Sequence, residues 1–208
     1  PADSFRRPPR LSLAIRGVGG QGNLFFGKVL AQVAFLAGYD DRNILKGETH
    51  GMAQMGGPVI STFGCGEVFS PALVPGTANV LIAMEKAEVL RPGFLDLLEP
   101  GGTVLMADTR ILPHGLKPEA YPSDEAIAAQ LEGYRVVSVD VLSIALNLGD
   151  PKGRCANVAM LGVLSTLPPF DVVPEAVWLQ ALRGISRKPA LWDLNHAAFM
   201  AGRGMQKG

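Results

Sequence analysis

Cysteine is scarce in this sequence of 208 residues, which contains only Cys65 and Cys155. Neither belongs to a Cys-x-x-Cys pair, so an iron–sulfur cluster or a zinc site built by this chain alone is excluded, and we expect no metal ligands here. Each cysteine is more typical of a small buried hydrophobe than of a reactive thiol. So few cysteines fit a reducing cytoplasm.

Net charge and long apolar runs are also missing. Lys and Arg number 19 and Asp and Glu number 19, so the composition provides neither a basic surface for nucleic acid nor an acidic tail. Charged residues make up 18% of the chain against 48% hydrophobic residues, a ratio that favours burial against other subunits. Apolar runs such as residues 80–84 fall far short of the ~20 residues that cross a bilayer, so we expect no contact with a membrane.

The order of elements predicts an α/β fold. We expect a flexible N-terminal arm over residues 1–10 and a single domain over residues 11–208. Alternating or apolar runs predict strands at 11–15, 41–45, 59–64, 79–84, 103–107 and 134–140, with a glycine-dense loop at 46–58. Helical spacing predicts helices from residue 24 to a C-cap at Gly38, at 87–98, from Asp124 after a Ser123 cap, and at 157–167, 174–183 and 191–201. We therefore predict a Rossmann-like, mostly parallel sheet flanked by helices, with a helical C-terminal part.

A glycine-rich turn follows the first expected strand. Gly17, Gly19 and Gly22 have the G-x-G-x-x-G spacing, with Gly20 and Gln21 inside the turn. Missing side chains let a ligand approach the backbone, and the free N–H groups of a helix start attract anions. The turn therefore indicates a site for phosphate or pyrophosphate, although the same glycines also suit a helix packed closely on its strand.

A dinucleotide site asks in addition for an acidic residue about 20 positions on, at the end of the second strand. Asp40 and Asp41 have that spacing, but they precede the expected strand, whose end carries Lys46 and Glu48. A cation beside the turn suits a phosphate better than a ribose diol, so coenzyme A is served at least as well as NAD.

A second motif, residues 48–61, reads Glu-Thr-His-Gly-Met-Ala-Gln-Met-Gly-Gly-Pro-Val-Ile-Ser. Together with the glycine turn, it resembles the gamma subunit or gamma domain of the 2-oxoacid:acceptor oxidoreductases. Within that superfamily the chain looks most like the beta subunit of indolepyruvate ferredoxin oxidoreductase and the equivalent phenylglyoxylate-type subunit. Agreement continues at residues 121–123, 156–162 and 195–202, and so covers nearly the whole chain.

The resemblance implies membership of an enzyme complex. Such complexes decarboxylate a 2-oxoacid on thiamine diphosphate, pass electrons through iron–sulfur clusters to ferredoxin or another acceptor, and release an acyl-CoA. Thiamine diphosphate, Mg²⁺ and [4Fe-4S] clusters are then expected in partner subunits, since Gly149-Asp150-Pro151 lacks the expected thiamine diphosphate pattern. This chain would pack on those subunits and help to place coenzyme A, without activity of its own.

Both motifs supply the candidate site residues. Glu48 and His50 have possible supporting roles in chemistry, or they form a structural pair at a subunit interface. Met52, Gln54 and the nearby glycines suit a loop pressed against a partner. The candidate cofactor-binding residues are Gly17, Gly19, Gly20, Gln21, Gly22, Glu48, His50, Gly51, Met52, Gln54, Gly56 and Gly57.

Other residues are more typical of structural roles than of catalytic ones. Asp108 and Asp140 end strands and are more typical of helix caps than of catalytic acids. Asn157 begins an apolar helix and suits a cap or an interface contact. Two further functions stay open on the glycine turn alone: an independent NAD(P)-dependent dehydrogenase and a nucleotide-sensing domain.

Overall fold

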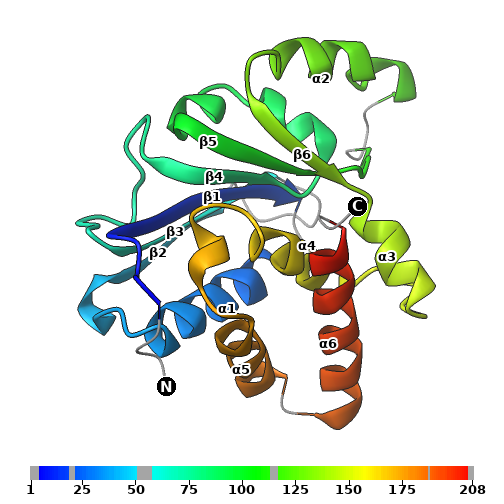
Figure 1. Cartoon of the computed structure of the whole chain (residues 1–208). Helices are drawn as coiled ribbons and strands as arrows, with labels where there is room; N and C mark the ends of the chain where they lie inside the picture. The colour runs from blue at the N-terminus through cyan, green and yellow to red at the C-terminus, as the bar shows by residue number, and fades with distance from the viewer. Residues whose placement is uncertain (1–4, 19–21, 51–57, 113–116, 187, 206–208) are drawn as a thin grey trace.

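Six strands form one mixed sheet in the computed structural model, which describes residues 5–18, 22–50, 58–112, 117–186 and 188–205 (Figure 1). Their order across the sheet is β2-β3-β1-β4-β5-β6. The strands are β1 (Arg10–Val18), β2 (Ile44–His50), β3 (Pro58–Gly66), β4 (Ala78–Ala83), β5 (Leu98–Ala107) and β6 (Arg135–Val139).

Strand directions place the ends of five strands at one edge. Strands β1, β4, β5 and β6 pair in parallel, whereas β3 is antiparallel to both β1 and β2. The carboxyl ends of β1, β2, β4, β5 and β6 therefore meet at the same edge, which we call the carboxyl edge. The α/β class is confirmed, and the β2–β3 hairpin makes the sheet mixed.

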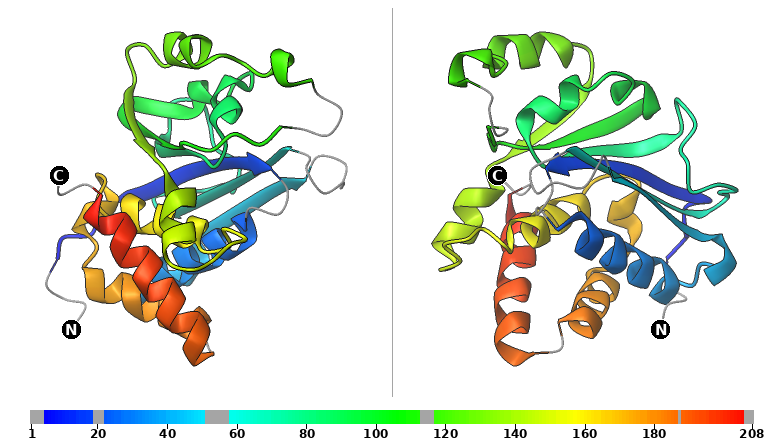
Figure 2. Two further views of the ribbon diagram at one scale, coloured as in Figure 1. Left: turned by 90° about the vertical axis from the view of Figure 1, so that its right-hand side faces the viewer. Right: turned by 180° about the vertical axis from the view of Figure 1, so that it is seen from behind.

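Helices cover both faces of the sheet (Figure 2). One face carries α1 (Asn23–Leu36), α4 (Ala156–Leu164), α5 (Glu175–Ile185) and α6 (Pro189–Gly204), while α3 (Val141–Asn147) extends from the carboxyl edge. The other face carries α2 (Asp124–Gln130) and the 3₁₀ helices η2 (Lys86–Leu90) and η3 (Leu95–Leu97). No helix among the described residues is long and apolar enough to span a membrane.

A separate hydrophobic cluster covers each face of the sheet, because successive side chains of a strand point to opposite faces. Leu13 and Ile15 of β1 belong to the cluster under α1, α4 and α5, while Ala14 between them belongs to the cluster on the opposite face. In α4 every residue from Asn157 to Leu164 is buried, which confirms that its all-round apolar sequence is core.

The N-terminal residues contact the domain. Arg10 is the first residue of β1, and its guanidinium forms an ion pair with Glu99 at 2.8 Å. The carbonyl oxygen of Pro8 accepts a hydrogen bond from the Tyr39 hydroxyl at 2.8 Å. Part of the expected arm, at Pro8 and Arg10, therefore contacts the rest of the domain.

Most expected elements are confirmed, including the Ser123 cap of α2. The C-cap of α1 is Ala37, and the expected Gly38 follows it with φ 85°. The helix expected at 87–98 is wrong, because Pro92 and Gly93 (φ 77°) split this segment into η2 and η3. Strand β5 then begins at Leu98, within that expected helix.

The second expected strand is displaced. Residues 41–43 form a 3₁₀ helix, η1 (Asp41–Asn43), and β2 continues through His50 into the segment expected to be a loop. Pairing with β3 overrides the weak local preference of this glycine-containing segment.

Candidate functional site

The two sequence motifs meet at the carboxyl edge. Gly17, near the end of β1, pairs with Val59 of β3, and Val59 pairs in turn with His50 at the end of β2. The three backbones lie side by side although the motifs are separated in sequence. The strand register therefore brings the glycine turn and the start of the second motif to neighbouring places.

The structure describes four of the candidate residues. Gly17 is buried in β1, and Gly22 caps the N-terminus of α1 with φ 82°. Glu48 and His50 lie in β2 rather than in a loop, because β2 extends along β3 through both residues; the Glu48 side chain is exposed. Outside the described residues lie Gly19, Gly20, Gln21, Gly51, Met52, Gln54, Gly56 and Gly57.

Asp40 and Asp41 lie at the opposite edge of the sheet. Asp41 is in η1 before β2, whose first residue, Ile44, pairs with Cys65 near the end of β3. The Asp40 carboxylate is engaged by Arg42 at 2.5 Å. The acidic residue of a dinucleotide site lies at the carboxyl end of the second strand, so this geometry argues against a ribose-binding role for Asp40 or Asp41.

A pocket of about 400 Å³ opens at the carboxyl edge. It lies beyond β4 and β5, beside the N-terminal ends of α1, α3 and α4, and we call it the edge pocket. In parallel α/β sheets, ligands bind outside the carboxyl ends of the strands. Among the residues that line the edge pocket are Gly22, Met84, Arg110, Lys152, Arg154 and Asn157.

All three charged side chains that line the edge pocket within the described residues are cations. Arg110 follows β5, whereas Lys152 and Arg154 belong to the α3–α4 loop. The N-termini of α1 and α4 add partial positive charge and backbone N–H groups. The edge pocket is therefore suited to an anion, with Met84 and Val141 supplying apolar wall.

Asn157 adds a neutral polar group to this pocket. Its side chain is almost fully buried (7% exposed), and its amide Nδ2 lies 3.4 Å from the carbonyl oxygen of Gly22. The other end of the carboxamide, Oδ1, is buried without a hydrogen-bond partner. A buried acceptor in that state costs free energy, so it marks a place where a donor would be stabilised.

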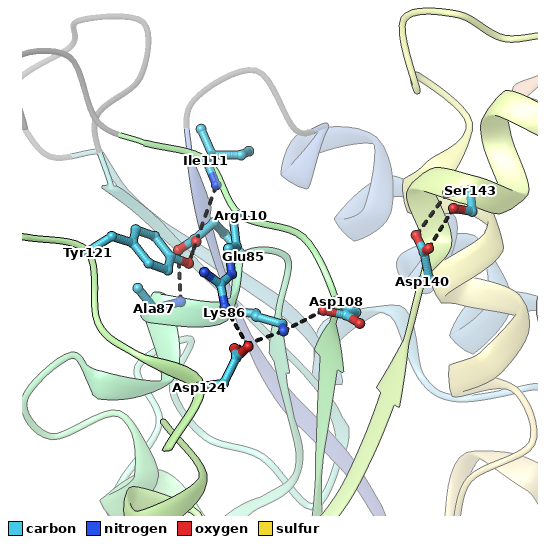
Figure 3. Close-up of polar contacts among 10 residues, drawn as sticks. All are labelled: Glu85, Lys86, Ala87, Asp108, Arg110, Ile111, Tyr121, Asp124, Asp140 and Ser143. Carbon is cyan, nitrogen blue, oxygen red and sulfur yellow. Dashed lines mark hydrogen bonds and ion pairs between the residues drawn. The ribbon is translucent and has the colours of Figure 1, made fainter. Parts of the chain in front are cut away.

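An ion-pair network positions Arg110 (Figure 3). Lys86 Nζ lies 2.5 Å from Asp108 and 3.1 Å from Asp124, and Arg110 lies 2.5 Å from the other oxygen of Asp124. The guanidinium of Arg110 also lies 5.5 Å from the centre of the Tyr121 ring. The hydrogen bond to Asp108 and the neighbouring carboxylates raise the pKa of Lys86.

Glu85 fastens the segment after β5 to the end of β4. Its carboxylate is 3% exposed and accepts hydrogen bonds from the Tyr121 hydroxyl and the backbone N–H groups of Ala87 and Ile111 (Figure 3). Burial raises the pKa of Glu85, although these donors oppose the shift. Because Ile111 follows Arg110, Glu85 helps to fix this wall of the edge pocket.

Two further aspartates shape the pocket from their own loops. Asp140 caps α3, accepting from Ser143 N at 2.9 Å and from Ser143 Oγ at 2.5 Å, which confirms the expected cap. Asp150 is buried and accepts from the backbone of Cys155 at 2.8 Å. Asp150 therefore organises the loop that carries Lys152.

The remaining sequence expectations are simple to place. Cys65 and Cys155 are buried and free, as expected. His196 stacks on Trp192 with ring centres 5.1 Å apart, and His114 lies outside the described residues. Asp108 pairs with Lys86 and is not the helix cap that its strand-end position suggested.

The edge pocket has no continuous signature in the sequence. Arg110, Lys152 and Arg154 belong to no motif, and they converge only because β5 and the α3–α4 loop end at the same edge. The one local signal is Asn157, a polar residue at the start of an apolar helix, and this position is also typical of a cap or an interface contact.

Comparison with known proteins identifies the family. The family model described as pyruvate ferredoxin/flavodoxin oxidoreductase matches residues 12–205. The chain belongs to this family. Among its relatives in the family is the indolepyruvate oxidoreductase subunit IorB of Thermococcus kodakarensis, which is 33% identical over 197 residues covering 92% of this chain and 93% of the relative.

Solved structures share the fold of this family member. Pyruvate oxidoreductase subunit PORC of Thermotoga maritima superposes with a TM-score of 0.68 at 20% identity, over 94% of this chain and 96% of that chain. A 2-oxoglutarate:ferredoxin oxidoreductase from Magnetococcus marinus, with 2-oxoglutarate, coenzyme A and succinyl-CoA bound, gives 0.69 at 18% identity, over 97% of this chain and 32% of that chain. Homologues of the chain are thus subunits of 2-oxoacid oxidoreductases, which are enzymes.

Proposed function

We propose that this chain is a subunit of a thiamine-diphosphate-dependent aryl-2-oxoacid oxidoreductase of the indolepyruvate or phenylglyoxylate type. The observation that carries the proposal is the 33% identity to an indolepyruvate oxidoreductase subunit over almost the whole of both chains. In the proposed reaction, an aryl 2-oxoacid and coenzyme A react with two equivalents of oxidised ferredoxin, or with another acceptor. The products are an aryl-acyl-CoA, CO₂, a proton and the two-electron-reduced acceptor.

The residues present support a division of labour among subunits. Both cysteines are buried, Cys65 in the sheet and Cys155 at the start of α4, so they do not suit a cluster held by this chain. We assign thiamine diphosphate, Mg²⁺ and the [4Fe-4S] clusters to partner subunits, where decarboxylation and electron transfer take place. This chain packs on those subunits and contributes to coenzyme A binding.

The edge pocket supports the coenzyme A part of the proposal. Coenzyme A carries a pyrophosphate and a 3′-phosphate, and the pocket offers Lys152, Arg154 and Arg110 beside the N-terminus of α1. Charge-assisted hydrogen bonds from such groups are strong and favour phosphate over neutral ligands. In this role the chain binds and orients the coenzyme, whose thiol accepts the acyl group.

Activity of the isolated chain and of the assembled complex tests the proposal. The complex is purified through an affinity tag on this chain and assayed for 2-oxoacid-dependent, coenzyme-A-dependent reduction of a viologen dye. We expect turnover with indolepyruvate, phenylglyoxylate or phenylpyruvate and none from the chain alone. Oxidative decarboxylation by the isolated chain, or preference for pyruvate over every aromatic acid, would contradict it.

A second candidate is an independent NAD(P)-dependent dehydrogenase, favoured by the left-handed Gly22 at the start of α1. Titration of the isolated chain with NADH and NADPH by calorimetry distinguishes the two. Micromolar binding, a common affinity for such nucleotides, would favour the dehydrogenase. We expect no binding, because Asp40 and Asp41 lie at the far edge of the sheet.

A further inference from the structure

The orientation of the Asn157 carboxamide is fixed by its neighbour. The carbonyl oxygen of Gly22 can only accept hydrogen bonds, so the Asn157 atom that faces it at 3.4 Å must be the amide Nδ2. Oδ1, the other polar atom of the carboxamide, is buried and has no hydrogen-bond partner. The edge pocket, which Asn157 lines, therefore presents a buried acceptor.

The same pocket also contains cations, which favour a negatively charged ligand atom instead of a hydrogen-bond donor. Lys152 forms no ion pair within the described residues. The Arg154 side chain is 75% exposed, and its one ion pair within those residues, from Nε to Asp150 Oδ1, is long at 3.6 Å. Both cations are therefore available to an incoming anion. The start of α4, a nine-residue helix, lies between these cations and Asn157 in the sequence.

Acceptor and cations together define the ligand. An anion without a proton to donate would satisfy the cations and leave Asn157 Oδ1 unpaired, whereas a neutral molecule would leave the cations unused. A molecule that carries both a phosphate and an O–H or N–H group satisfies both. Leaving a buried polar group unpaired is the main way in which sites reject ligands that lack the matching donor.

We propose that the edge pocket binds a phosphorylated ligand through Lys152 and Arg154, and that Asn157 Oδ1 accepts a hydrogen bond from a hydroxyl or amide N–H of that ligand. Asn157 is then a specificity-determining residue. This inference rests on the proposed function, because coenzyme A carries such donors in two places. They are the amides and hydroxyl of the pantetheine arm and the donor groups of the adenosine.

Ligand binding by the assembled complex tests this proposal. Dissociation constants are measured by calorimetry for coenzyme A, 4′-phosphopantetheine and adenosine 3′,5′-bisphosphate. The variants are Asn157→Leu, which keeps the branched side-chain shape and removes the acceptor, and Lys152→Ala with Arg154→Ala. Lys188→Ala, an exposed lysine before α6 that does not line the pocket, is the matched control.

The cation variants are expected to weaken all three ligands by at least tenfold, more at low salt, while Lys188→Ala leaves them unchanged. We expect Asn157→Leu to weaken coenzyme A by about tenfold, the scale of one lost hydrogen bond. If Asn157→Leu also weakens the binding of phosphopantetheine but not of the bisphosphate, the donor lies in the pantetheine arm. If it weakens the binding of the bisphosphate but not of phosphopantetheine, the donor lies in the adenosine. Either result supports the proposal.

Unchanged affinity of Asn157→Leu for all three ligands would overturn the role of Asn157, and unchanged affinity of the cation variants would overturn the pocket. If the Asn157→Leu complex does not assemble, Asn157→Ala replaces it. Alanine also lacks the acceptor, so equal binding would again overturn the role of Asn157. A wild-type complex without 2-oxoacid oxidation contradicts the proposed function instead, so the two failures are distinguishable.

Discussion

The amide nitrogen of Asn157 lies 3.4 Å from the carbonyl oxygen of Gly22, and this contact joins the start of α4 to the cap of α1. A Cβ atom on residue 22 would lie 2.2 Å from the same nitrogen. Residue 22 also has φ 82°, a conformation that favours glycine. The last glycine of the turn is therefore required by backbone conformation and by packing.

Gly22→Ala is predicted to destabilise the protein by more than backbone strain alone. Gly149→Ala is the matched control, because Gly149 has φ 80° and nothing within 4 Å of an added Cβ. We expect about 1–2 kcal/mol for Gly149→Ala and at least about 1 kcal/mol more for Gly22→Ala. Urea unfolding of both variants measures the difference.

A double-mutant cycle isolates the contact. Asn157→Ala removes the nitrogen that the new methyl group would meet, so Gly22→Ala should cost less in that background. Equal costs in the two backgrounds would show that residue 22 and Asn157 do not interact.

Glu85 is predicted to make stability depend on pH. Burial raises its pKa above the ordinary value of 4.5, so the folded state binds the proton more tightly than the unfolded state. Its contribution is therefore most favourable below pH 4.5 and declines as pH rises through the folded-state pKa. The stability of wild type relative to Glu85→Gln should fall over that interval, as measured by urea unfolding at a series of pH values.

Tyr121→Phe provides the comparison. Removing the tyrosine hydroxyl removes a donor that lowers the pKa of Glu85, so the decline should extend to higher pH. If the stability of wild type relative to Glu85→Gln rises with pH above 4.5, the pKa of Glu85 is not raised by burial and the prediction is wrong.

Asp140 is predicted to have the opposite dependence. Hydrogen bonds from the Ser143 side chain and backbone lower the pKa of Asp140, so its contribution is present above the ordinary value of 3.8 and is lost as pH falls through the folded-state pKa. Asp140→Ala should cost about 1 kcal/mol at neutral pH, as for other helix caps. Asp140→Asn, which still caps, should cost less; equal losses in thermal unfolding would exclude a capping role.

Both cysteines are predicted to resist modification in the folded protein. Burial raises the pKa of Cys65 to about 12 and that of Cys155 to about 11, so thiolate is rare at neutral pH. Ellman's reagent at pH 8 should label neither thiol in native protein and both in urea. Stoichiometric labelling before unfolding would show that one of these sites is accessible.

The sequence predicted the features that are encoded locally. Alternation and helical spacing were sufficient for β1, α1 and α4, and Ser123 and Asp124 marked the start of α2. The helix predicted at 87–98 is wrong because its apolar spacing resembles a helix, whereas Pro92 and Gly93 interrupt the segment. The predicted bounds of the second strand are wrong because pairing with β3 determines where β2 begins and ends.

The edge pocket depends on contacts distant in sequence. Gly22 and Asn157 are 135 positions apart, and no periodicity relates them. Lys152 and Arg154 become neighbours of α1 only when the parallel strands align their carboxyl ends. The short motifs lie at the carboxyl edge, whereas the charged side chains that line the edge pocket come from the second half of the chain.

Purification of the tagged chain from its own cells tests the central claim most directly. Mass spectrometry identifies the proteins that copurify, and an absorbance scan detects iron–sulfur chromophores. The account predicts a coloured complex that contains a thiamine-diphosphate-binding subunit and cluster-bearing polypeptides. A colourless assembly of this chain alone would contradict membership of an oxidoreductase complex.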